Sequence, residues 1–243
     1  MNIISKVACS LVEDEQRNII DIGCNRGYTL IEIKDNFRQL VGIDCSEKAL
    51  AVAMKEAKSK NIHFLLARAE ELPVRSGTFR IAICAETIEH VSSEDKVLDE
   101  INRILEDRGK LLITFPVWHT EKIISFFNKD FMSYSGHVKS FSLAKIQQLL
   151  NKHCFKIIKK NRYYFEWALL YTLEAIFSKK FSGCNGRLRS YEPSAMPDNW
   201  DKLEFLTKRV IKFLESIFIG RIILAALNFL YPKTYIFLCE KEP

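Results

Sequence analysis

Short apolar runs alternate with amphipathic stretches through the first 160 residues of the chain. The apolar runs have the length and the β-branched composition of buried strands. Six strands are therefore expected, at Asn18–Ile22, Leu40–Asp44, Ile62–Leu66, Arg80–Ala85, Lys110–Phe115 and Phe155–Lys160. Helical periodicity predicts helices at Asn2–Val12, Thr29–Asn36, Glu47–Ser59, Glu94–Leu105 and Leu143–Lys152. This alternation is typical of a mostly parallel sheet with helices on both faces.

The pattern changes after about residue 161. Helices are expected at Tyr163–Phe181 and Leu203–Leu230, with a link at Ser182–Asn199 and a last strand at Thr234–Cys239. Roughly seventy residues thus separate the sixth and seventh strands, far more than an ordinary connection needs. We expect one domain over residues 1–243, with a core at 1–160, a helical insertion at 161–232 and a final strand at 233–241.

Composition favours a cytoplasmic protein. The 243 residues are 48% hydrophobic, which is enough for one sizeable core. The seven cysteines are odd in number and form no CxxC pair, which disfavours a disulfide framework and a zinc site and suits a reducing compartment. Residues 1–16 have neither a basic flank nor a long apolar core, so a secretory signal is not expected.

The net charge of +6 is unevenly distributed. Residues 1–150 hold 20 Lys and Arg against 21 Asp and Glu, whereas residues 151–243 hold 16 against 9, which leaves +7 in the last third. That third is also rich in aromatic and aliphatic residues. Such a segment favours an anionic membrane surface or an acidic lipid-like ligand over DNA, and a solubilising charged face is the competing interpretation.

The strongest chemical signal is Ile19–Gly27 (IIDIGCNRG). It predicts a buried strand that ends in an acid, followed by a glycine turn whose backbone can approach a ligand closely. The next strand ends in Val41–Asp44 (VGID), which brings a second acid 23 residues after the first. A carboxylate at that place can accept hydrogen bonds from both hydroxyls of a ribose.

Charge separates the two nucleotide cofactors that use this arrangement. A dinucleotide fingerprint requires glycines at 23, 25 and 28, but Asn25 and Tyr28 stand at the second and third places. Asp21 would repel a pyrophosphate, whereas it would attract the ammonium group of a methionine moiety. The alternative is a purely structural role, in which Asp21 caps a turn and Asp44 is a solvated strand end. This alternative could explain either acid alone, but it explains the presence of both less well.

Several motifs in order resemble those of one enzyme family. The segment Asp21–Gly27 resembles the first motif of class I S-adenosylmethionine-dependent methyltransferases, and Val41–Asp44 the second. Later segments agree with further family motifs, namely Ala69–Pro73 (AEELP), Phe79–Val91 (FRIAICAETIEHV) and Leu105–Pro116 (LEDRGKLLITFP). His137–Phe155 is similar to a helix entry of the type 11 subgroup, which includes quinone-biosynthesis methyltransferases.

This resemblance covers about residues 16–160. It implies a single methyltransferase domain with a Rossmann-like, doubly wound α/β fold. The expected sheet has seven strands with the last one antiparallel, and a helical cap is inserted between strands six and seven.

The resemblance also implies a binding site for S-adenosyl-L-methionine. The implied residues are Asp21, Gly23, Cys24, Asn25, Gly27, Asp44, Cys45, Ala69, Glu70, Ala85 and Glu86. Asp21 and the turn after it would hold the methionine end, and Asp44 the ribose. Cys45, Ala69 and Glu70 would flank the adenine. Ala85 and Glu86 would lie beside the sulfonium.

Three positions depart from the family pattern. Asn25 replaces the usual middle glycine, which is tolerable because asparagine accepts positive φ more readily than most residues. Arg68 stands where the family often has an aspartate that binds the adenine amino group. Asp107-Arg108-Gly109 replaces a Pro-Gly-Gly turn, and Gly109 also fits a stop after the helix that ends near Leu105.

Histidines are the candidate bases. Methyl transfer from a sulfonium is an in-line displacement, so a base is needed only where a hydroxyl or carbon acid must lose a proton. His63 begins a strand and His153 ends a helix, so both are interpreted as structural. His90, after the fourth strand, is the first candidate, and His137, in the long Val117–Ser140 connection, is the second. A polar loop histidine is the alternative for each.

Nucleic acid is not expected as a partner. Methylation of base amino groups in this fold commonly uses an Asn/Asp-Pro-Pro-aromatic loop, and Cys84-Ala85-Glu86-Thr87 stands there instead. Neither a Pro-Cys nucleophile nor a paired-Glu clamp for arginine is recognisable.

The insertion suggests a hydrophobic acceptor. Ile217–Tyr231 is nearly all apolar but too short to span a bilayer, and a buried helix is its simplest interpretation. With Trp167, Leu169, Leu170 and Tyr171 it would form an apolar cap.

We therefore predict methyl transfer to an O or C atom of a small or lipid-like acceptor, with peripheral contact at the inner membrane surface through residues 161–232. An NAD-dependent oxidoreductase, a non-catalytic S-adenosylmethionine-binding protein and a nucleic-acid methyltransferase are the alternatives.

Overall fold

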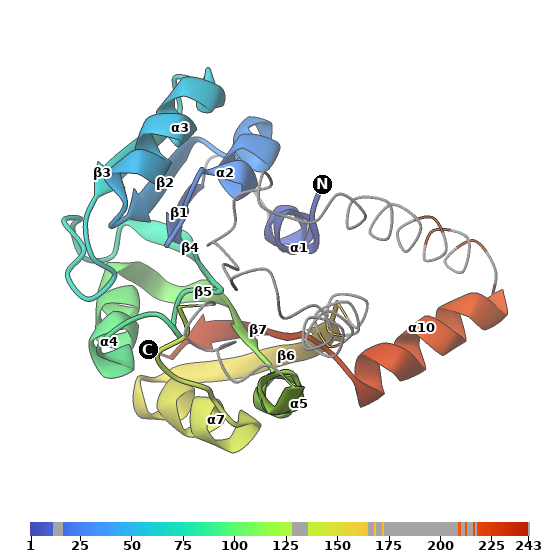
Figure 1. Cartoon of the computed structure of the whole chain (residues 1–243). Coiled ribbons are helices and arrows are strands. Elements are labelled where there is room, and N and C mark those ends of the chain that lie inside the picture. Colours follow the sequence, from blue (N-terminus) through green and yellow to red (C-terminus); the bar gives the residue numbers. More distant parts are fainter. Residues whose placement is uncertain are drawn as a thin grey trace, which may run out of the picture. The chain divides into compact units, whose positions relative to one another are not determined.

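A seven-stranded sheet organises the chain (Figure 1). The computed structural model describes residues 1–11, 17–127, 136–164 and 218–242, with residues 168, 172, 209, 212 and 216. The strands are β1 (Asn18–Ile22), β2 (Gln39–Asp44), β3 (Ile62–Leu66), β4 (Phe79–Ala85), β5 (Leu105–Pro116), β6 (Phe155–Tyr163) and β7 (Thr234–Lys241). Their order across the sheet is β3-β2-β1-β4-β5-β7-β6.

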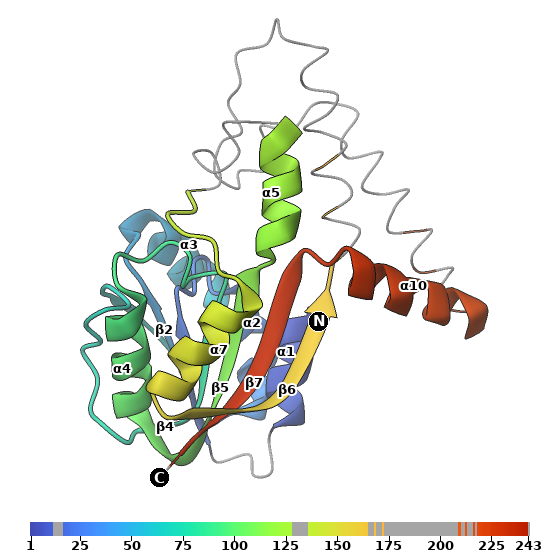
Figure 2. The ribbon, with the colours of Figure 1, turned by 90° about the horizontal axis from the view of Figure 1, so that it is seen from below.

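The first five strands are parallel and β7 runs against them. The amide of Val117 donates to the Lys233 carbonyl at 2.8 Å, while Lys110 pairs with Glu240 at the other end, so β7 is antiparallel to β5. β7 lies between β5 and β6 (Figure 2). The predicted Rossmann-like sheet with a reversed last strand is thereby confirmed.

Helices cover both faces of the sheet. The described helices are α1 (Ile3–Ser10), α2 (Tyr28–Ile33), the 3₁₀ turn η1 (Lys34–Asn36), α3 (Glu47–Ala57), α4 (Glu94–Ile104), α5 (Trp118–Phe127), α7 (Leu143–Lys152) and α10 (Phe218–Leu230). Figure 1 shows α1, α2 and α3 on one face and α4 and α7 on the other. Ser46, Ser93 and Ser142 cap the first turns of α3, α4 and α7, each accepting an amide hydrogen through its hydroxyl.

The core lies where the parallel strands are covered on both sides. Ile19, Ile20 and Ile22 of β1 are fully buried, as are Ile81 and Ile83 of β4. Strands buried on both faces have continuous apolar sequences rather than alternating ones, which is why the runs were recognisable. The carboxyl ends of β1, β2 and β4 consequently meet at one edge of this rigid layer.

Several bounds differ from the expectation, and two differences are the largest. Residues 118–127 form the helix α5 within the expected long connection. Gly109 is not a helix stop: α4 ends at Ile104, and Leu105 is already extended and opens β5 opposite Phe79. The register then shifts, so that Ile81 faces Lys110, and Arg108 in the extra stretch has a φ of +58°. The prediction that Gly109 ends the helix was therefore wrong, because Gly109 lies within β5, next to a bulge that shifts the register of the strand.

The chain divides into two compact units. Unit 1 comprises residues 1–115, 141–161 and 236–243, and unit 2 comprises residues 116–140 and 162–235. Most of the helices expected at 163–181 and 203–230, and Trp167, Leu169, Leu170 and Tyr171, lie outside the described residues. Within the described ranges, no helix is both long and apolar enough to cross a bilayer.

Candidate functional site

A tight turn follows β1 and leans on β2. The amides of Gly23 and Cys24 both donate to the Ile43 carbonyl, at 2.7 and 2.9 Å. Gly23, Asn25 and Gly27 have φ values of +75°, +49° and +71°. Glycine adopts such values without steric cost, and asparagine tolerates them better than most residues do. The turn therefore accommodates Asn25, the first departure from the family pattern.

Side chains from distant strands decide which residues fit this turn. A Cβ at Gly23 would lie 2.2 Å from Thr87 Oγ1, and a Cβ at Gly27 would lie 2.8 Å from the Phe64 ring. The Thr87 hydroxyl is within hydrogen-bond distance of carbonyl oxygens at the ends of β1 and β4, at 3.2 and 2.9 Å. The turn is thus confined by groups that neighbour it only in the folded chain.

Asp44 ends β2 and is held by backbone amides. Its Oδ2 accepts from the amide of Asn25 and its Oδ1 from the amide of Ser46, both at 2.8 Å. The side chain is half-buried. A carboxylate oxygen has more than one acceptor position, so both oxygens can accept a further hydrogen bond. Two neighbouring hydroxyl groups would supply such a pair of donors.

Asp21, on the adjacent strand, is in the opposite situation. It is only 4% exposed, and its carboxyl makes no hydrogen bond within the described part of the chain. Burial, and then the negative charge of Asp44, raise the pKa of Asp21 to about 7. A cation placed beside the carboxyl would favour its ionised form. The end of β1 therefore has the electrostatics of a position for a positively charged group.

Glu70, expected near the adenine, contacts the loop after β4. Its Oε1 accepts from the hydroxyl and the amide of Ser92, at 2.7 and 3.0 Å, and from Arg68 at 3.2 Å. Burial alone would raise the pKa of Glu70, but these hydrogen bonds outweigh burial and lower the pKa to about 2. Ala69 is half-buried and Cys45 is exposed. Glu70 thus joins two loops, and Arg68 pairs with it.

Glu86 follows β4 in a strained conformation. Its φ is +48°, and its amide donates to the carbonyl and the hydroxyl oxygen of Thr114, at 3.2 and 3.0 Å. The Thr114 hydroxyl lies 3.2 Å from Glu86 Oε1. Non-glycine residues rarely adopt positive φ, and such strain is often found at binding sites. Ala85 and Glu86 are both half-buried.

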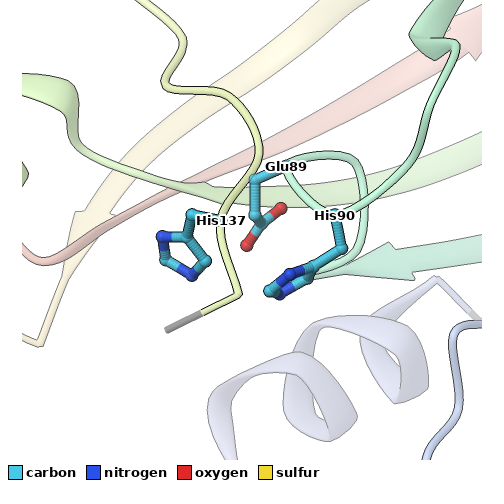
Figure 3. A group of neighbouring side chains, drawn as sticks. All are labelled: Glu89, His90 and His137. Carbon is cyan, nitrogen blue, oxygen red and sulfur yellow. The ribbon is translucent and has the colours of Figure 1, made fainter. Parts of the chain in front are cut away.

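The loop after β4 also carries His90. Figure 3 shows Glu89 and His90 as successive side chains on this loop. Glu89 is fully buried, whereas His90 is exposed, and the amide of His90 donates to the Thr87 carbonyl at 3.0 Å. His90 is therefore accessible, and its backbone is tied to the residue that confines the glycine turn.

The second candidate base, His137, belongs to unit 2. Its Nδ1 lies within hydrogen-bond distance of Glu121 Oε1, and the Ser140 hydroxyl donates to Glu121 Oε2 at 2.5 Å. Glu121 lies on α5 and is 4% exposed. A carboxylate that accepts from Nδ1–H leaves Nε2 of the neutral ring as a proton acceptor. Glu121 thus orients the His137 ring.

Six residues of these arrangements were not predicted from the sequence: Phe64, Thr87, Ser92, Thr114, Glu121 and Ser140. Thr87 and Ser92 act through contacts with the segments around Gly23 and Glu70, which are far away along the chain. An indirect signal existed only for Thr87, because a glycine requirement at 23 implies a close neighbour. The acid in WHTEKIISFF gave no sign of burial.

Comparison with known proteins identifies the domain. Residues 20–113 match the family model described as a methyltransferase domain, of type 11. The uncharacterized methyltransferase YcgJ of Bacillus subtilis (strain 168) is 24% identical over 152 residues, which cover 60% of this chain and 60% of the relative. Demethylmenaquinone methyltransferase of Lactococcus lactis subsp. lactis (strain IL1403) is 27% identical over 144 residues, or 54% and 56%. The matches thus span little more than half the length of these relatives.

Solved structures agree with the fold. The crystal structure of YcgJ from Bacillus subtilis matches with a TM-score of 0.61 at 17% identity, over 99% of this chain and 98% of that chain. At this identity the likeness shows the shared fold alone. Support for the family expected from the motifs comes instead from the match over residues 20–113 and from the two relatives. Residues 20–113 match a methyltransferase domain of type 11, and this match together with the two relatives supports a class I S-adenosylmethionine-dependent methyltransferase with S-adenosyl-L-methionine as its cofactor.

Proposed function

We propose that this chain transfers the methyl group of S-adenosylmethionine to an oxygen or carbon atom of a small, hydrophobic or lipid-like acceptor. The proposal depends above all on the two aspartates at the ends of β1 and β2. Asp21 is buried without a hydrogen-bond donor in the described part of the chain, and Asp44 is held by two amides. One carboxylate suits a cation and the other suits a pair of hydroxyls.

These residues fit the cofactor. The ammonium group of the methionine end would neutralise Asp21, and the ribose hydroxyls would use the remaining acceptor positions of Asp44. The close approach of Thr87 and Phe64 leaves glycine backbone at 23 and 27, where no side chain would obstruct a ligand. When bound, the cofactor supplies a methyl group on a sulfonium that is already activated for displacement.

The remaining tasks of the protein are to align the acceptor and to receive its proton. Ala85 and Glu86, held in place by Thr114, are the proposed lining beside the reacting carbon. An acceptor hydroxyl or carbon acid must lose a proton, and His90 or His137 is the proposed base. His90 is exposed, and His137 is oriented by Glu121.

Two observations favour a hydrophobic acceptor, and a third disfavours nucleic acid. One matched relative is named for a quinone precursor, demethylmenaquinone. The +7 charge of residues 151–243 coincides with a high aromatic and aliphatic content. The loop after β4 also lacks the Asn/Asp-Pro-Pro-aromatic sequence commonly used on the amino groups of nucleic-acid bases. We therefore propose a cytoplasmic enzyme that meets an acceptor of low polarity.

Calorimetry tests the cofactor assignment. The purified chain is titrated separately with S-adenosylmethionine, S-adenosylhomocysteine and NAD. We expect binding of the first two and not of NAD. Binding of NAD alone would identify a nicotinamide oxidoreductase and overturn the proposal.

Methyl transfer is tested with S-adenosylmethionine labelled at the methyl carbon. The enzyme is incubated with an organic-solvent lipid extract, an aqueous metabolite extract, and total RNA or DNA. We expect label in the organic extract, with stoichiometric S-adenosylhomocysteine. Label in nucleic acid would overturn the acceptor assignment, and tight binding without turnover in any extract would identify a binding protein.

The base is identified by paired variants once an acceptor fraction is known. His90→Gln and His137→Gln are compared over a pH series. We expect the base variant to lower kcat by roughly 10²–10⁴-fold and to abolish the acidic limb of the profile. Glu121→Gln is the matched control, because it should reduce the rate only if His137 is the base. Wild-type profiles for both histidine variants would show that neither acts as a base.

A further inference from the structure

The helix α10 differs from the other helices in what it exposes. In α4 the buried side chains are the apolar Val97, Leu98, Ile101 and Ile104, and charged residues face the solvent. In α10 the residues exposed among those whose side chains the structure describes are all apolar: Ile222, Ile223, Ala225, Ala226, Phe229 and Leu230. We call these six residues the outer face of α10.

The outer face is a continuous stripe. Ile222, Ala225, Ala226 and Phe229 follow the spacing of three and four residues that lines one side of a helix. Ile222, Phe229 and Leu230 are 55%, 64% and 70% exposed. The opposite side contains Leu224, which is 8% exposed and packs inward. Water alone is an unfavourable environment for a stripe of this kind, and contiguous exposed apolar surface commonly marks an interaction site.

The helix is fixed within its unit. The Arg162 guanidinium donates to the Phe229 carbonyl at 2.8 Å and lies 4.3 Å from the centre of the Phe229 ring. The amide of Tyr231 donates to the Leu227 carbonyl at 2.8 Å, which closes the last turn. Arg162 thus anchors the C-terminal end of α10 through Phe229, and the helix presents the rest of its outer face from this anchored end.

Charge indicates the kind of partner. Arg209 and Lys212 are helical and exposed on the segment that precedes α10, and the last 93 residues carry a net charge of +7. α10 has 13 residues, about 20 Å at 1.5 Å per residue, so it is too short to span a bilayer. A short helix with an apolar face and nearby cations is typical of elements that lie in the headgroup region of a membrane.

We infer that the outer face of α10 binds the surface of a lipid bilayer rich in anionic headgroups, with Arg209 and Lys212 contributing the attraction to the headgroups. A neutral protein surface would not be attracted by the positive charges of Arg209 and Lys212. A second copy of this chain would carry the same positive charges and would be repelled by them. This inference goes beyond methyl transfer. Its test needs neither cofactor nor acceptor, so it can fail while the proposed function stands.

Cosedimentation with large unilamellar vesicles tests the inference. The full chain is compared on phosphatidylcholine vesicles and on vesicles that also contain phosphatidylserine. We expect binding to the anionic vesicles that weakens as salt is added. No binding to anionic vesicles would overturn the inference, as would equal binding to both compositions that salt does not change.

Variants separate the apolar from the ionic contribution. Replacing Ile222 and Phe229 together by glutamine, a good helix former, should lower partitioning at least about tenfold. Arg209→Gln with Lys212→Gln should lower binding to anionic vesicles by about fivefold per charge. Met54→Gln on α3 is the matched control, because Met54 is 58% exposed but lies far from α10 in sequence and in another unit. Equal losses in the control and the α10 variant would overturn the assignment to this helix.

Two measurements exclude the remaining explanations. The substitution Phe229→Trp keeps an apolar aromatic side chain at this position. When anionic vesicles are added, the fluorescence of the introduced tryptophan should shift to the blue and be quenched by brominated lipid. Unchanged added fluorescence would overturn the inference whether or not the glutamine variants fold. Light scattering without lipid should show the same mass for wild type and the Ile222/Phe229 variant, whereas a dimer lost in the variant would assign the outer face to a second copy instead.

Discussion

The carboxyl ends of β1 and β2 lie side by side, and each carries an aspartate in a contrasting environment. Asp44 is half-buried, and two backbone amides hold its oxygens. Asp21 is buried, lacks a hydrogen bond within the described residues and has its pKa raised to about 7. The difference suggests a division of labour: a satisfied carboxylate presents oriented acceptors to neutral hydroxyls, and an unsatisfied one selects a charge.

The largest expected effect comes from breaking the turn that joins the two ends. Gly23→Ala adds a Cβ to a residue whose φ is +75°, and this Cβ would lie 2.2 Å from Thr87 Oγ1. Positive φ and overpacking should together lower the free energy of unfolding by about 2–4 kcal/mol, measured by urea denaturation. Gly77→Ala is the control, because Gly77 has φ +61° but no atom within 4 Å of the added Cβ. Equal losses in the two variants would show that Thr87 does not confine the turn.

Removing the satisfied carboxylate should mainly affect binding. Asp44→Ala deletes charge-assisted hydrogen bonds, which should weaken S-adenosylmethionine binding by about 1–3 kcal/mol, or roughly five- to 150-fold in calorimetry. Glu106→Ala removes an exposed acid elsewhere and should leave the affinity unchanged. Wild-type affinity in a folded Asp44→Ala protein would remove Asp44 from the site.

Asp21 should make cofactor binding depend on pH. Binding to the ionised carboxyl strengthens as pH rises through its pKa of about 7, so affinity should increase by about five- to tenfold between pH 6 and pH 8. The upper end is limited because an α-ammonium group deprotonates near pH 8. Asp21→Asn should flatten the profile in calorimetry. A profile that keeps its slope in the variant would assign the pH dependence to another group.

The raised pKa of Asp21 also predicts how the stability of the unliganded protein depends on pH. The folded pKa of about 7 exceeds the ordinary value of 3.8, so protonated Asp21 contributes stability below about pH 4, and this is lost as pH rises through about 7. Melting temperatures across this range should therefore fall more steeply for wild type than for Asp21→Asn.

The smallest effect is expected at Arg68. Its side chain is 68% exposed and pairs with Glu70, and exposed ion pairs contribute less than about 1 kcal/mol. Arg68→Ala should change the cofactor affinity by no more than about fivefold in the same assay. A loss as large as that of Asp44→Ala would show that Arg68 contacts the nucleoside directly.

Much of the sheet was predictable because its strands are buried on both faces. Asn18–Ile22, Ile62–Leu66 and the helix Leu143–Lys152 match the expected bounds to the residue. α5 was missed because its pattern is mixed: Glu121 is 4% exposed, whereas Phe126 is 76% exposed. Such a distribution follows from tertiary contacts and gives no clean helical stripe.

The site divides in the same way. Asp21, Gly23 and Asp44 could be proposed from the sequence because a strand, a turn and a strand end are local patterns. Thr87 and Ser92 were missed because their roles are contacts with the segments around Gly23 and Glu70, and neither residue type carries a distinctive signal. The bulge at Arg108 was hidden because a non-glycine residue adopts the positive φ there.

The place of β7 has a consequence for how the chain assembles. β7 is the last strand in sequence but lies inside the sheet, between β5 and β6. The edge strand β6 is hydrogen-bonded to β7 and joins the rest of the sheet by way of it. During synthesis β6 must therefore wait for some seventy further residues before it gains its neighbour, and closing so long a loop carries an entropic cost. Mutations that slow the collapse of that stretch should accordingly trap a five-stranded intermediate with an open edge that is prone to aggregation.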